Sequence, residues 1–300
     1  MVTGPIALEC KVRTMDPVAQ PASAHAEDVA RRDRFEFGEN WQRFLDVLDD
    51  ERIHEAELSL CEMLGLESLD GRSFLDVGSG SGLFSLAARR LGAQRVHSFD
   101  FDPASVACTR ELRRRYFPDD PRWTVDEGNV LDQDFVAGLG KWDIVYSWGV
   151  LHHTGAMWRA LEHAQSTAAD DALLFLAIYN DQGVKSQLWR VVKRIYNRLP
   201  KTLRPLYAAL VMGPRELLGF GFTVAQGKPM RYVRSWTQYK RSRGMSRRHD
   251  LVDWVGGYPF EVAKPEEILA FHLRRGFTLV KLITCAGGLG CNQYVFERTS

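Results

Sequence analysis

The sequence predicts an α/β fold: a mostly parallel sheet of seven strands with helices on both faces, an N-terminal helical cover and a basic helical insert. Strand-like and helix-like stretches alternate from residue 73 to residue 180, which is typical of parallel strands joined by helices. A glycine-rich turn joins the first of these strands to its helix. Near the C-terminus, two strand-like stretches joined by "GGLG" indicate an antiparallel hairpin and one reversed strand.

The alternating elements follow one another in a regular order. Strands are predicted over residues 73–78, 95–100, 122–130, 142–151, 172–180, 278–286 and 292–298, and helices over 82–93, 103–117, 157–168 and 265–277. Pro118 ends the second of these helices, and Pro265 and Gly276 mark the two ends of the last one. Residues 250–300 are therefore expected to complete the sheet that residues 31–183 begin.

The N-terminal part should divide into a tail and a helical cover. Residues 1–30 mix Pro, Ala, Ser and charged residues without an apolar period, which predicts a poorly ordered tail. The stretch "NWQRFLDVLDDERIHEAELSLCEMLG" places apolar residues at helical spacing up to Gly65. It predicts one or two helices that cover the start of the core.

Residues 184–249 form a basic insert. Between Gly183 and His249 there are sixteen Lys or Arg and one acid, Glu216, so the rest of the chain is net acidic. In "QLWRVVKRIYNRLP" the predicted helix has an apolar face formed by Leu188, Trp189, Val192, Ile195, Tyr196 and Leu199, and a largely basic face formed by Arg190, Lys193, Arg194 and Arg198. The next stretch, "LYAALVMGPRELLGFGF", is apolar but too short and interrupted to span a bilayer.

The overall composition excludes several classes of protein. A formal net charge of +1 gives no global attraction to nucleic acid or membrane, and DNA is not expected as a partner. Five dispersed cysteines without a CxxC pair argue against a disulfide framework and against structural zinc. No basic stretch followed by an apolar one opens the chain, so a cytoplasmic location is expected.

The glycine-rich turn, "DVGSGSGL", indicates a nucleoside site. Glycines at a strand–turn–helix junction let the backbone approach a ligand, and the helix start presents free N–H groups. A dinucleotide site would need a third glycine at Leu83 and would not favour Asp76, which would repel a pyrophosphate. Asp76 suits a cation instead, and Asp100, at the end of the next strand, can accept hydrogen bonds from ribose hydroxyls. S-adenosylmethionine (SAM), with an amino group, a sulfonium and no phosphate, meets both conditions.

Four stretches, "FLDVGSGSG", "VHSFDFDP", "EGNVLD" and "WDIVYSWGVLHH", resemble the successive motifs of class I SAM-dependent methyltransferases. The resemblance is to the small-molecule branch similar to ubiquinone O-methyltransferases, and further stretches such as "RFEFGENWQRFLD" look like marks of a bacterial subgroup. It implies a Rossmann-like sheet with SAM across the carboxyl ends of the strands. The cofactor-binding residues that it implies are Asp76, Gly78, Ser79, Gly80, Gly82, Asp100, Phe101, Asn129, Val130, Ser147 and Trp148. Asn129 stands where the family usually has Asp.

Methyl transfer from a sulfonium is an in-line displacement, so the protein supplies positioning and, for a hydroxyl acceptor, a base. His152 and His153 follow the fourth strand and are candidate bases, with His153 preferred; the alternative is that they cap the next helix or satisfy a loop. A second polar group, "RRHDLVDWVGGYPFE", adds His249 and Asp250 as candidates for the acceptor pocket, or is a solvated connection. No regular ligand spacing supports a metal there.

The function predicted is transfer of a methyl group, most simply to oxygen, on a small-molecule or glycan acceptor. The basic insert has three interpretations. It is a solvated lid, it attracts an anionic or lipid-linked acceptor, or its basic amphipathic helix lies on an anionic membrane. RNA is disfavoured because no basic platform with interleaved aromatic residues is evident. The alternatives are a tRNA-modifying methyltransferase, suggested by "GVLHH", and a non-catalytic SAM-binding protein.

Overall fold

The computed structural model describes residues 27–31, 34–237, 251, 254–288 and 290–299. Seven strands form one sheet in the order β3-β2-β1-β4-β5-β7-β6. They are β1 (Ser73–Val77), β2 (Arg95–Asp100), β3 (Trp123–Glu127), β4 (Trp142–Trp148), β5 (Ala168–Tyr179), β6 (Phe277–Ile283) and β7 (Cys291–Arg298). Strand β7 runs antiparallel to both of its neighbours, and the other pairs are parallel. The predicted α/β fold with one reversed strand is confirmed.

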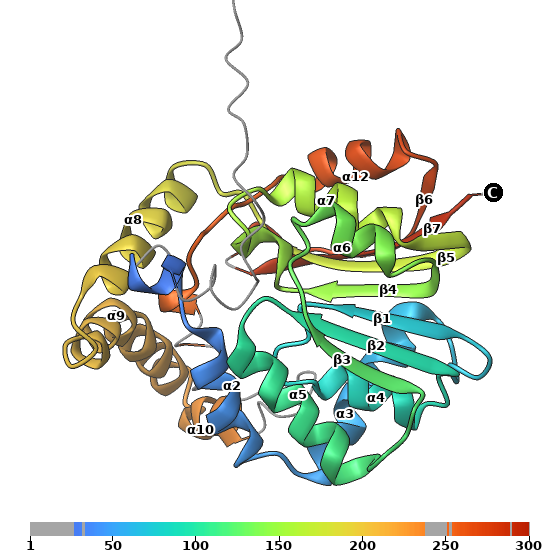
Figure 1. Ribbon diagram of the computed structural model, residues 1–300. Coiled ribbons are helices and arrows are strands. Elements are labelled where there is room, and N and C mark those ends of the chain that lie inside the picture. Colours follow the sequence, from blue (N-terminus) through green and yellow to red (C-terminus); the bar gives the residue numbers. More distant parts are fainter. Residues whose placement is uncertain (1–26, 32–33, 238–250, 252–253, 289, 300) are drawn as a thin grey trace, which may run out of the picture.

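Helices cover both faces of the sheet (Figure 1). One face carries α3 (Asp50–Leu64), α4 (Leu83–Arg90) and α5 (Pro103–Tyr116), with α2 (Phe37–Leu45) packed beside α5. The other face carries α6 (Gln133–Gly138), α7 (Met157–Ser166) and α12 (Pro265–Leu273). Gly65 ends α3 in the left-handed conformation, as the sequence predicts.

The sequence analysis missed α6, a helix of six residues. It begins because the Asp132 carboxylate accepts hydrogen bonds from the backbone N–H groups of Asp134 and Phe135. A helix this short carries too little apolar periodicity to be predicted. In the predicted tail, residues 27–30 are helical, and residues 1–26 lie outside the described part of the chain.

The described part of the insert, residues 184–237, forms three helices beyond the carboxyl ends of β1 and β4 (Figure 1): α8 (Val184–Arg198), α9 (Arg204–Ala225) and α10 (Pro229–Thr237). The stretch interrupted by Gly, Pro and Arg is one helix of 22 residues with Pro214 inside it. In the part of the chain that the structure describes, no helix is both long and apolar enough to cross a membrane.

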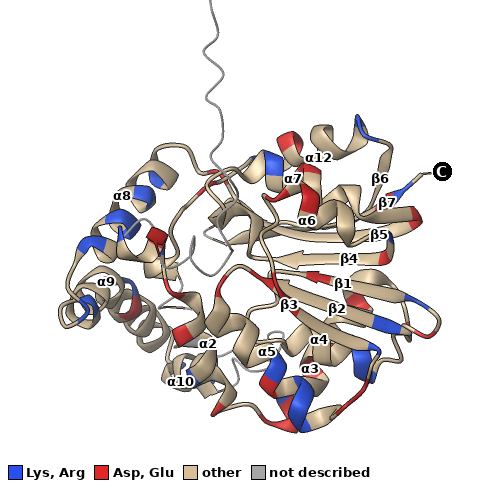
Figure 2. Cartoon of the chain, in the orientation of Figure 1, with Lys and Arg blue, Asp and Glu red and all other residues tan. Residues whose placement is uncertain are grey.

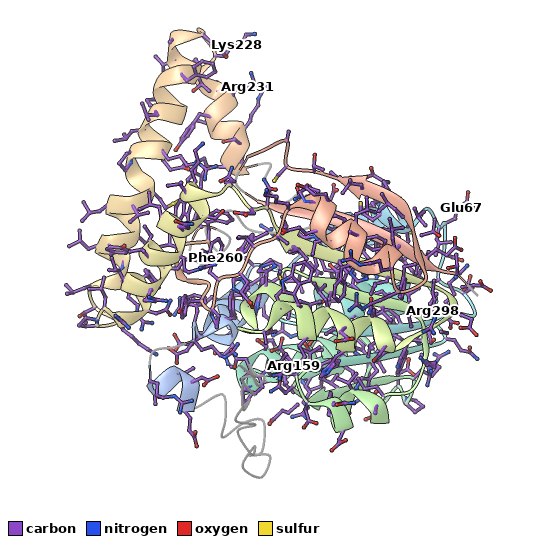
Figure 3. The ribbon with its side chains drawn as sticks, turned by 90° about the horizontal axis from the view of Figure 1, so that it is seen from above. Glu67, Arg159, Lys228, Arg231, Phe260 and Arg298 are labelled. Carbon is purple, nitrogen blue, oxygen red and sulfur yellow. The ribbon has the colours of Figure 1, made fainter. Side chains whose placement is uncertain are left out.

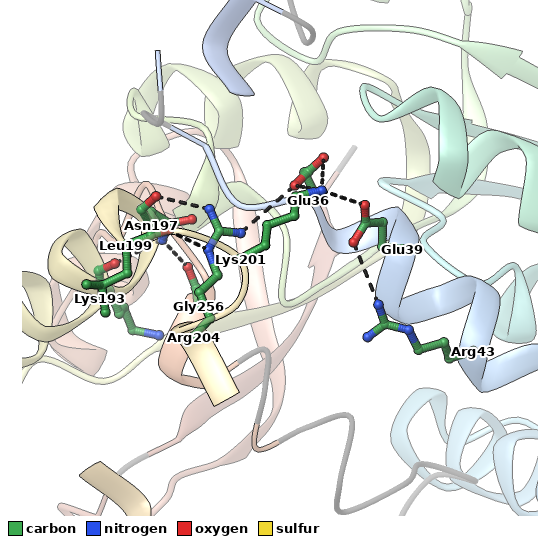
Figure 4. Close-up of polar contacts among 9 residues, drawn as sticks. All are labelled: Glu36, Glu39, Arg43, Lys193, Asn197, Leu199, Lys201, Arg204 and Gly256. Atoms are coloured by element: carbon green, nitrogen blue, oxygen red, sulfur yellow. Dashed lines mark hydrogen bonds and ion pairs between the residues drawn. The ribbon is translucent and has the colours of Figure 1, made fainter. Parts of the chain in front are cut away.

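Polar contacts attach the insert to the N-terminal helical cover (Figure 4). The Lys201 ammonium pairs with the carboxylates of Glu36 and Glu39 at 3.0 and 2.8 Å. The Asn197 amide donates to the carbonyl oxygen of Gly256 at 2.6 Å, and the Arg204 guanidinium donates to the carbonyl of Asn197 at 3.1 Å. The end of α8 and the start of α9 are thereby fixed against the core.

The predicted faces of α8 are wrong in one respect that matters for function. Lys193, placed on the basic face, is fully buried, whereas Leu188 and Ile195, placed on the apolar face, are exposed. The Lys193 ammonium donates to the Trp254 carbonyl and lies 4.8–5.3 Å from the ring centroids of Tyr179, Trp254 and Phe260. A desolvated ammonium among aromatic faces is attracted by each ring, which offsets the cost of burying the charge.

Replacing Lys193 with alanine should therefore lower the free energy of unfolding by about 2–4 kcal/mol, because a cavity forms and the Trp254 carbonyl loses its donor. Lys185→Ala, an exposed change on the same helix, should cost less than about 0.5 kcal/mol. Urea unfolding followed by circular dichroism compares the two variants. Equal midpoints would show that the Lys193 contacts contribute nothing.

Candidate active site

A cavity of about 580 Å³ lies at the carboxyl ends of the central strands. Three parts of the chain that are far apart in sequence line it: the strand ends with their following loops, the segment from Arg34 to Trp41, and the insert. The predicted cofactor residues on its wall are Asp76, Gly78, Ser79, Gly80, Asp100, Phe101, Asn129, Val130 and Trp148. A cavity of this size is typical of small-ligand sites.

The glycine turn forms the floor of the cavity and leaves no room for a side chain at Gly80. Gly78, Gly80 and Gly82 all have positive φ angles, of 80°, 55° and 81°. A Cβ atom at Gly80 would lie 2.9 Å from the indole nitrogen of Trp41 on α2, which packs over the turn. Gly82 is the N-cap of α4 and is not part of the wall, so its role is to set the turn.

Asp76 is buried beneath the turn and accepts a hydrogen bond of 2.5 Å from the Ser85 hydroxyl. Burial raises the pKa of this carboxyl to about 7. A cation placed in the cavity next to Asp76 would favour its ionised form and would reverse that shift. The site thus has the charge that the amino group or the sulfonium of SAM requires.

The Asp100 carboxylate connects the glycine turn to the loop that follows β2. Its two carboxylate oxygens accept backbone N–H groups of Gly80 and Asp102, each at 2.9 Å. Burial raises its pKa to about 6. Each carboxylate oxygen can accept a further hydrogen bond, so Asp100 can also receive two hydroxyl groups from the cavity.

The remaining predicted cofactor residues divide into wall residues and one buried residue. The Asn129 side-chain oxygen accepts the Leu131 N–H at 2.9 Å, which leaves the amide nitrogen as the group that can donate to a base edge. The Phe101 ring lies 4.8 Å from the Arg34 guanidinium. Ser147 is fully buried, donates to the Val77 carbonyl at 2.9 Å and does not line the cavity, so the structure gives it a role in joining β4 to β1.

The two adjacent histidines have different positions. His153 lines the cavity, and its Nδ1 lies 2.6 Å from the Pro259 carbonyl oxygen, which assigns the proton to Nδ1 and leaves Nε2 as an acceptor. Burial, with the Lys193 charge, lowers the pKa of His153 to about 3. His152 is fully buried outside the cavity wall, with its ring 3.9 Å from that of Tyr179. The structure thus packs His152 against Tyr179, and its role as a base stays a prediction.

The second predicted polar group is only partly described. His249 and Asp250 lie outside the described residues. Trp254, from the same stretch, lines the cavity, and the Glu261 carboxylate accepts the Met157 N–H at 3.0 Å at the start of α7. Among the residues that the structure describes, no three His, Cys, Asp or Glu side chains could together hold a metal ion.

Sequence reasoning missed the walls that come from outside the family motifs. The N-terminal segment contributes Arg34, Phe35, Phe37 and Trp41, and α9 contributes Met212, Arg215 and Glu216. The Arg34 guanidinium donates to the His153 carbonyl at 3.1 Å and pairs with Asp28 at 3.3 Å. The available signal was "RFEFGENW", a dense mixture of aromatic and charged residues in a segment without an assigned role.

Comparison with known proteins identifies the family. A family described as "Methyltransferase domain" matches residues 41–226, well over half of the chain, and the chain therefore belongs to it. With the cavity described above, membership makes this protein a SAM-dependent methyltransferase. The site contains two acids, Asp76 and Asp100, and a glycine turn that a ligand can approach closely. Leu83 stands where a dinucleotide site would have its third glycine, so the residues of the site fit SAM.

Curated relatives are similar over a limited part. The ribosomal protein L11 methyltransferase of Anoxybacillus flavithermus is 32% identical over 114 residues, 34% of this chain and 36% of that protein. That of Methylococcus capsulatus is 40% identical over 77 residues, 25% of this chain and 26% of that protein. The chain thus matches only about a third or less of the length of these relatives.

Solved structures share the fold at low identity. A methyltransferase in complex with the Trm112 methyltransferase activator of Haloferax volcanii is 13% identical, with a TM-score of 0.50, over 89% of this chain and 99% of that chain. The magnesium protoporphyrin IX methyltransferase of Synechocystis, solved with bound SAM, is 13% identical, with a TM-score of 0.48, over 95% of this chain and 100% of that chain. At 13% identity, the likeness to the first of these structures concerns the fold alone.

The raised pKa of Asp76 predicts that SAM binding depends on pH. The free carboxyl is protonated below about pH 7, and the cationic ligand requires it ionised, so binding releases a proton and affinity rises with pH. Between pH 6 and pH 8 the association constant should rise about tenfold for this one group. Calorimetric titrations of SAM at both values test this, and Asp76→Asn should flatten the dependence. An affinity that falls as the pH rises would contradict it.

Proposed function

We propose that the chain transfers the methyl group of SAM to an oxygen atom of a small molecule or glycan unit bound between the glycine turn and the insert. The observation that carries this proposal is the continuity of the cavity, whose wall extends from Gly80 to Arg215 on α9. Its outer part is lined by aromatic rings, those of Phe37, Tyr179 and Trp254. Such a lining suits a compact acceptor with an apolar body.

The chemistry asked of the protein is modest. SAM supplies an electrophilic methyl carbon: the acceptor oxygen forms a bond to it as the carbon–sulfur bond breaks, S-adenosylhomocysteine leaves with the electron pair of that bond, and the hydroxyl proton passes to solvent. The His153 side chain lines the cavity, and its neutral Nε2 can accept a hydrogen bond from the hydroxyl group that receives the methyl. Because its pKa of about 3 opposes lasting proton uptake, its main contribution is to orient that hydroxyl.

Two guanidinium groups on the cavity wall favour an anionic acceptor. They are those of Arg34, which also pairs with Asp28, and of Arg215, which is next to Glu216 on α9. A guanidinium has five N–H donors, so each can donate to an anionic ligand in addition to its partners in the protein. An acceptor with a carboxylate or phosphate, including a lipid-linked one, fits this arrangement. The finer resemblance, to ubiquinone O-methyltransferases, stays a prediction.

The test is to incubate the full chain with methyl-tritiated SAM and separate fractions of a bacterial extract: low-mass metabolites, lipids, glycans, tRNA and ribosomal proteins. We expect label in the metabolite, lipid or glycan fraction and its loss with Asp100→Ala. Label in ribosomal protein, the acceptor named for the curated relatives, or in tRNA would replace the proposed acceptor class. SAM binding without transfer to any fraction would favour a non-catalytic role.

A further inference from the structure

Helix α8 exposes an aliphatic stripe to solvent. Val184, Leu188, Val191 and Ile195 recur at intervals of four, three and four residues, which places them along one line of the helix. Their side chains are 79%, 64%, 52% and 43% exposed, while Lys193 on the opposite side is buried. Burial of the lysine and exposure of the aliphatic residues reverse the usual arrangement of a surface helix. This stripe is available for an apolar partner.

The next two helices continue the same feature. On α9, Leu206, Leu210, Leu217 and Val224 follow one line of the helix and are all exposed, Leu217 by 72%. The other side of α9 carries Met212, which is buried, and Arg215, which lines the cavity. On α10, Met230 and Val233 are exposed and no residue is buried. We call these ten residues of α8, α9 and α10 the insert face.

Basic side chains accompany the insert face. Between Val184 and Thr237 there are eleven Lys or Arg and one acid, Glu216. Nine of these basic residues are exposed: Lys185, Arg190, Arg194, Arg198, Lys201, Arg215, Lys228, Arg231 and Arg234. Figure 2 shows Lys and Arg at several points along α8, and Figure 3 shows Lys228 and Arg231 at the far end of the α9–α10 pair, away from the sheet.

We propose that the insert face docks on the surface of an anionic lipid bilayer. Exposed aliphatic residues on helices rich in Lys and Arg are what an interfacial helix presents: the apolar side chains enter the acyl boundary and the cations meet lipid headgroups. The charge decides between occupants, because a second copy of this chain would bring a second set of cations against the first. Since α9 also lines the cavity, docking places the acceptor end of the cavity near the lipid.

The experiment is co-sedimentation of the full chain with vesicles of phosphatidylcholine and phosphatidylglycerol (7:3) at low salt, beside vesicles of phosphatidylcholine alone. We expect the protein to pellet with the anionic vesicles only. Leu188→Ser with Leu217→Ser should weaken vesicle binding at least about tenfold, since two aliphatic side chains leave the acyl boundary. Lys228→Glu with Arg231→Glu should weaken it at least as much.

Matched controls make the result specific. Leu58→Ser with Val280→Ser changes two residues that are about half exposed on α3 and β6, and should leave vesicle binding unchanged. Arg159→Glu with Arg274→Glu makes the same change of charge away from the insert and should have a smaller effect. Calorimetry with SAM confirms that each variant is folded, and vesicle binding requires no methyl acceptor, so the proposed function is tested separately.

Three results would overturn the proposal. One is that the wild-type chain, shown to bind SAM, stays in the supernatant at low salt. Another is that light scattering finds a dimer that the serine variants dissociate, in which case a second copy covers the insert face. The third is that the charge variant abolishes vesicle binding while the serine variant does not, and that tRNA stays bound to the chain at higher salt than vesicles do. The basic residues would then bind RNA.

Discussion

Replacing Asp100 with alanine is expected to weaken SAM binding at least about a hundredfold while the fold survives. The variant lacks the carboxylate that would accept hydrogen bonds from two ribose hydroxyls. Each such bond to a charged group contributes about 1.5–3 kcal/mol to the binding free energy. The backbone N–H groups of Gly80 and Asp102 also lose their acceptor, so the turn becomes less ordered. Isothermal titration calorimetry measures the affinity, and circular dichroism the fold.

Asp126→Ala is the matched control for that result. Asp126 lies opposite Phe99 in the pairing of β2 and β3, its carboxylate is largely exposed, and it does not line the cavity. Its removal should change SAM affinity less than about twofold. If Asp100→Ala binds SAM as tightly as Asp126→Ala does, the assignment of Asp100 to the ribose is wrong.

Replacing His153 with alanine should lower kcat about a hundredfold, because the hydroxyl of the acceptor is no longer held in the orientation that in-line transfer requires. SAM affinity should stay within about threefold, since the Arg34 contact uses the backbone carbonyl of His153 and persists. His153→Gln keeps a hydrogen-bond acceptor and should restore part of the loss. Turnover is measured with the acceptor found in the labelling experiment.

The pH profile distinguishes orientation from simple base catalysis. With a pKa of about 3, His153 is neutral throughout pH 5–8, so it should add no break to kcat in that range. If kcat instead changes with a midpoint near pH 6.5, and His153→Ala lacks this change, substrate binding returns the pKa of His153 to its ordinary value. Full activity of His153→Ala would remove it from the chemistry altogether.

The sheet and the glycine turn could be predicted from the sequence because local rules govern them. Each strand is a short apolar stretch bounded by turn residues, and the reversed strand β7 follows from the short connection to β6. The positions of Asp76 and Asp100 on the cavity wall could be predicted because the strand–turn–helix geometry fixes them relative to the turn. The position of Ser147 could not, because its hydroxyl donates to the Val77 carbonyl instead of lining the cavity; its role toward the cofactor stays a prediction.

The insert could not be predicted in the same way because tertiary contacts override helical periodicity. Counting apolar positions on α8 favours Leu188 and Ile195 as the buried face, whereas the rings of Tyr179, Trp254 and Phe260 form a pocket for Lys193. Those rings come from two other parts of the chain, so no local pattern contains the information. The same holds for Arg34, which reaches the cavity from a segment 119 residues away from His153.

A crystal structure of the chain with S-adenosylhomocysteine, the product of methyl transfer, decides whether the glycine turn is the SAM site. We expect the product in the cavity at the glycine turn, with its ribose hydroxyls within hydrogen-bond distance of the Asp100 carboxylate and its sulfur on the side of His153. The outer part, between Phe37 and Arg215, would remain open for an acceptor. A product bound elsewhere would show that the glycine turn is not the SAM site, and one bound here with its sulfur pointing away from His153 would exclude His153 from methyl transfer.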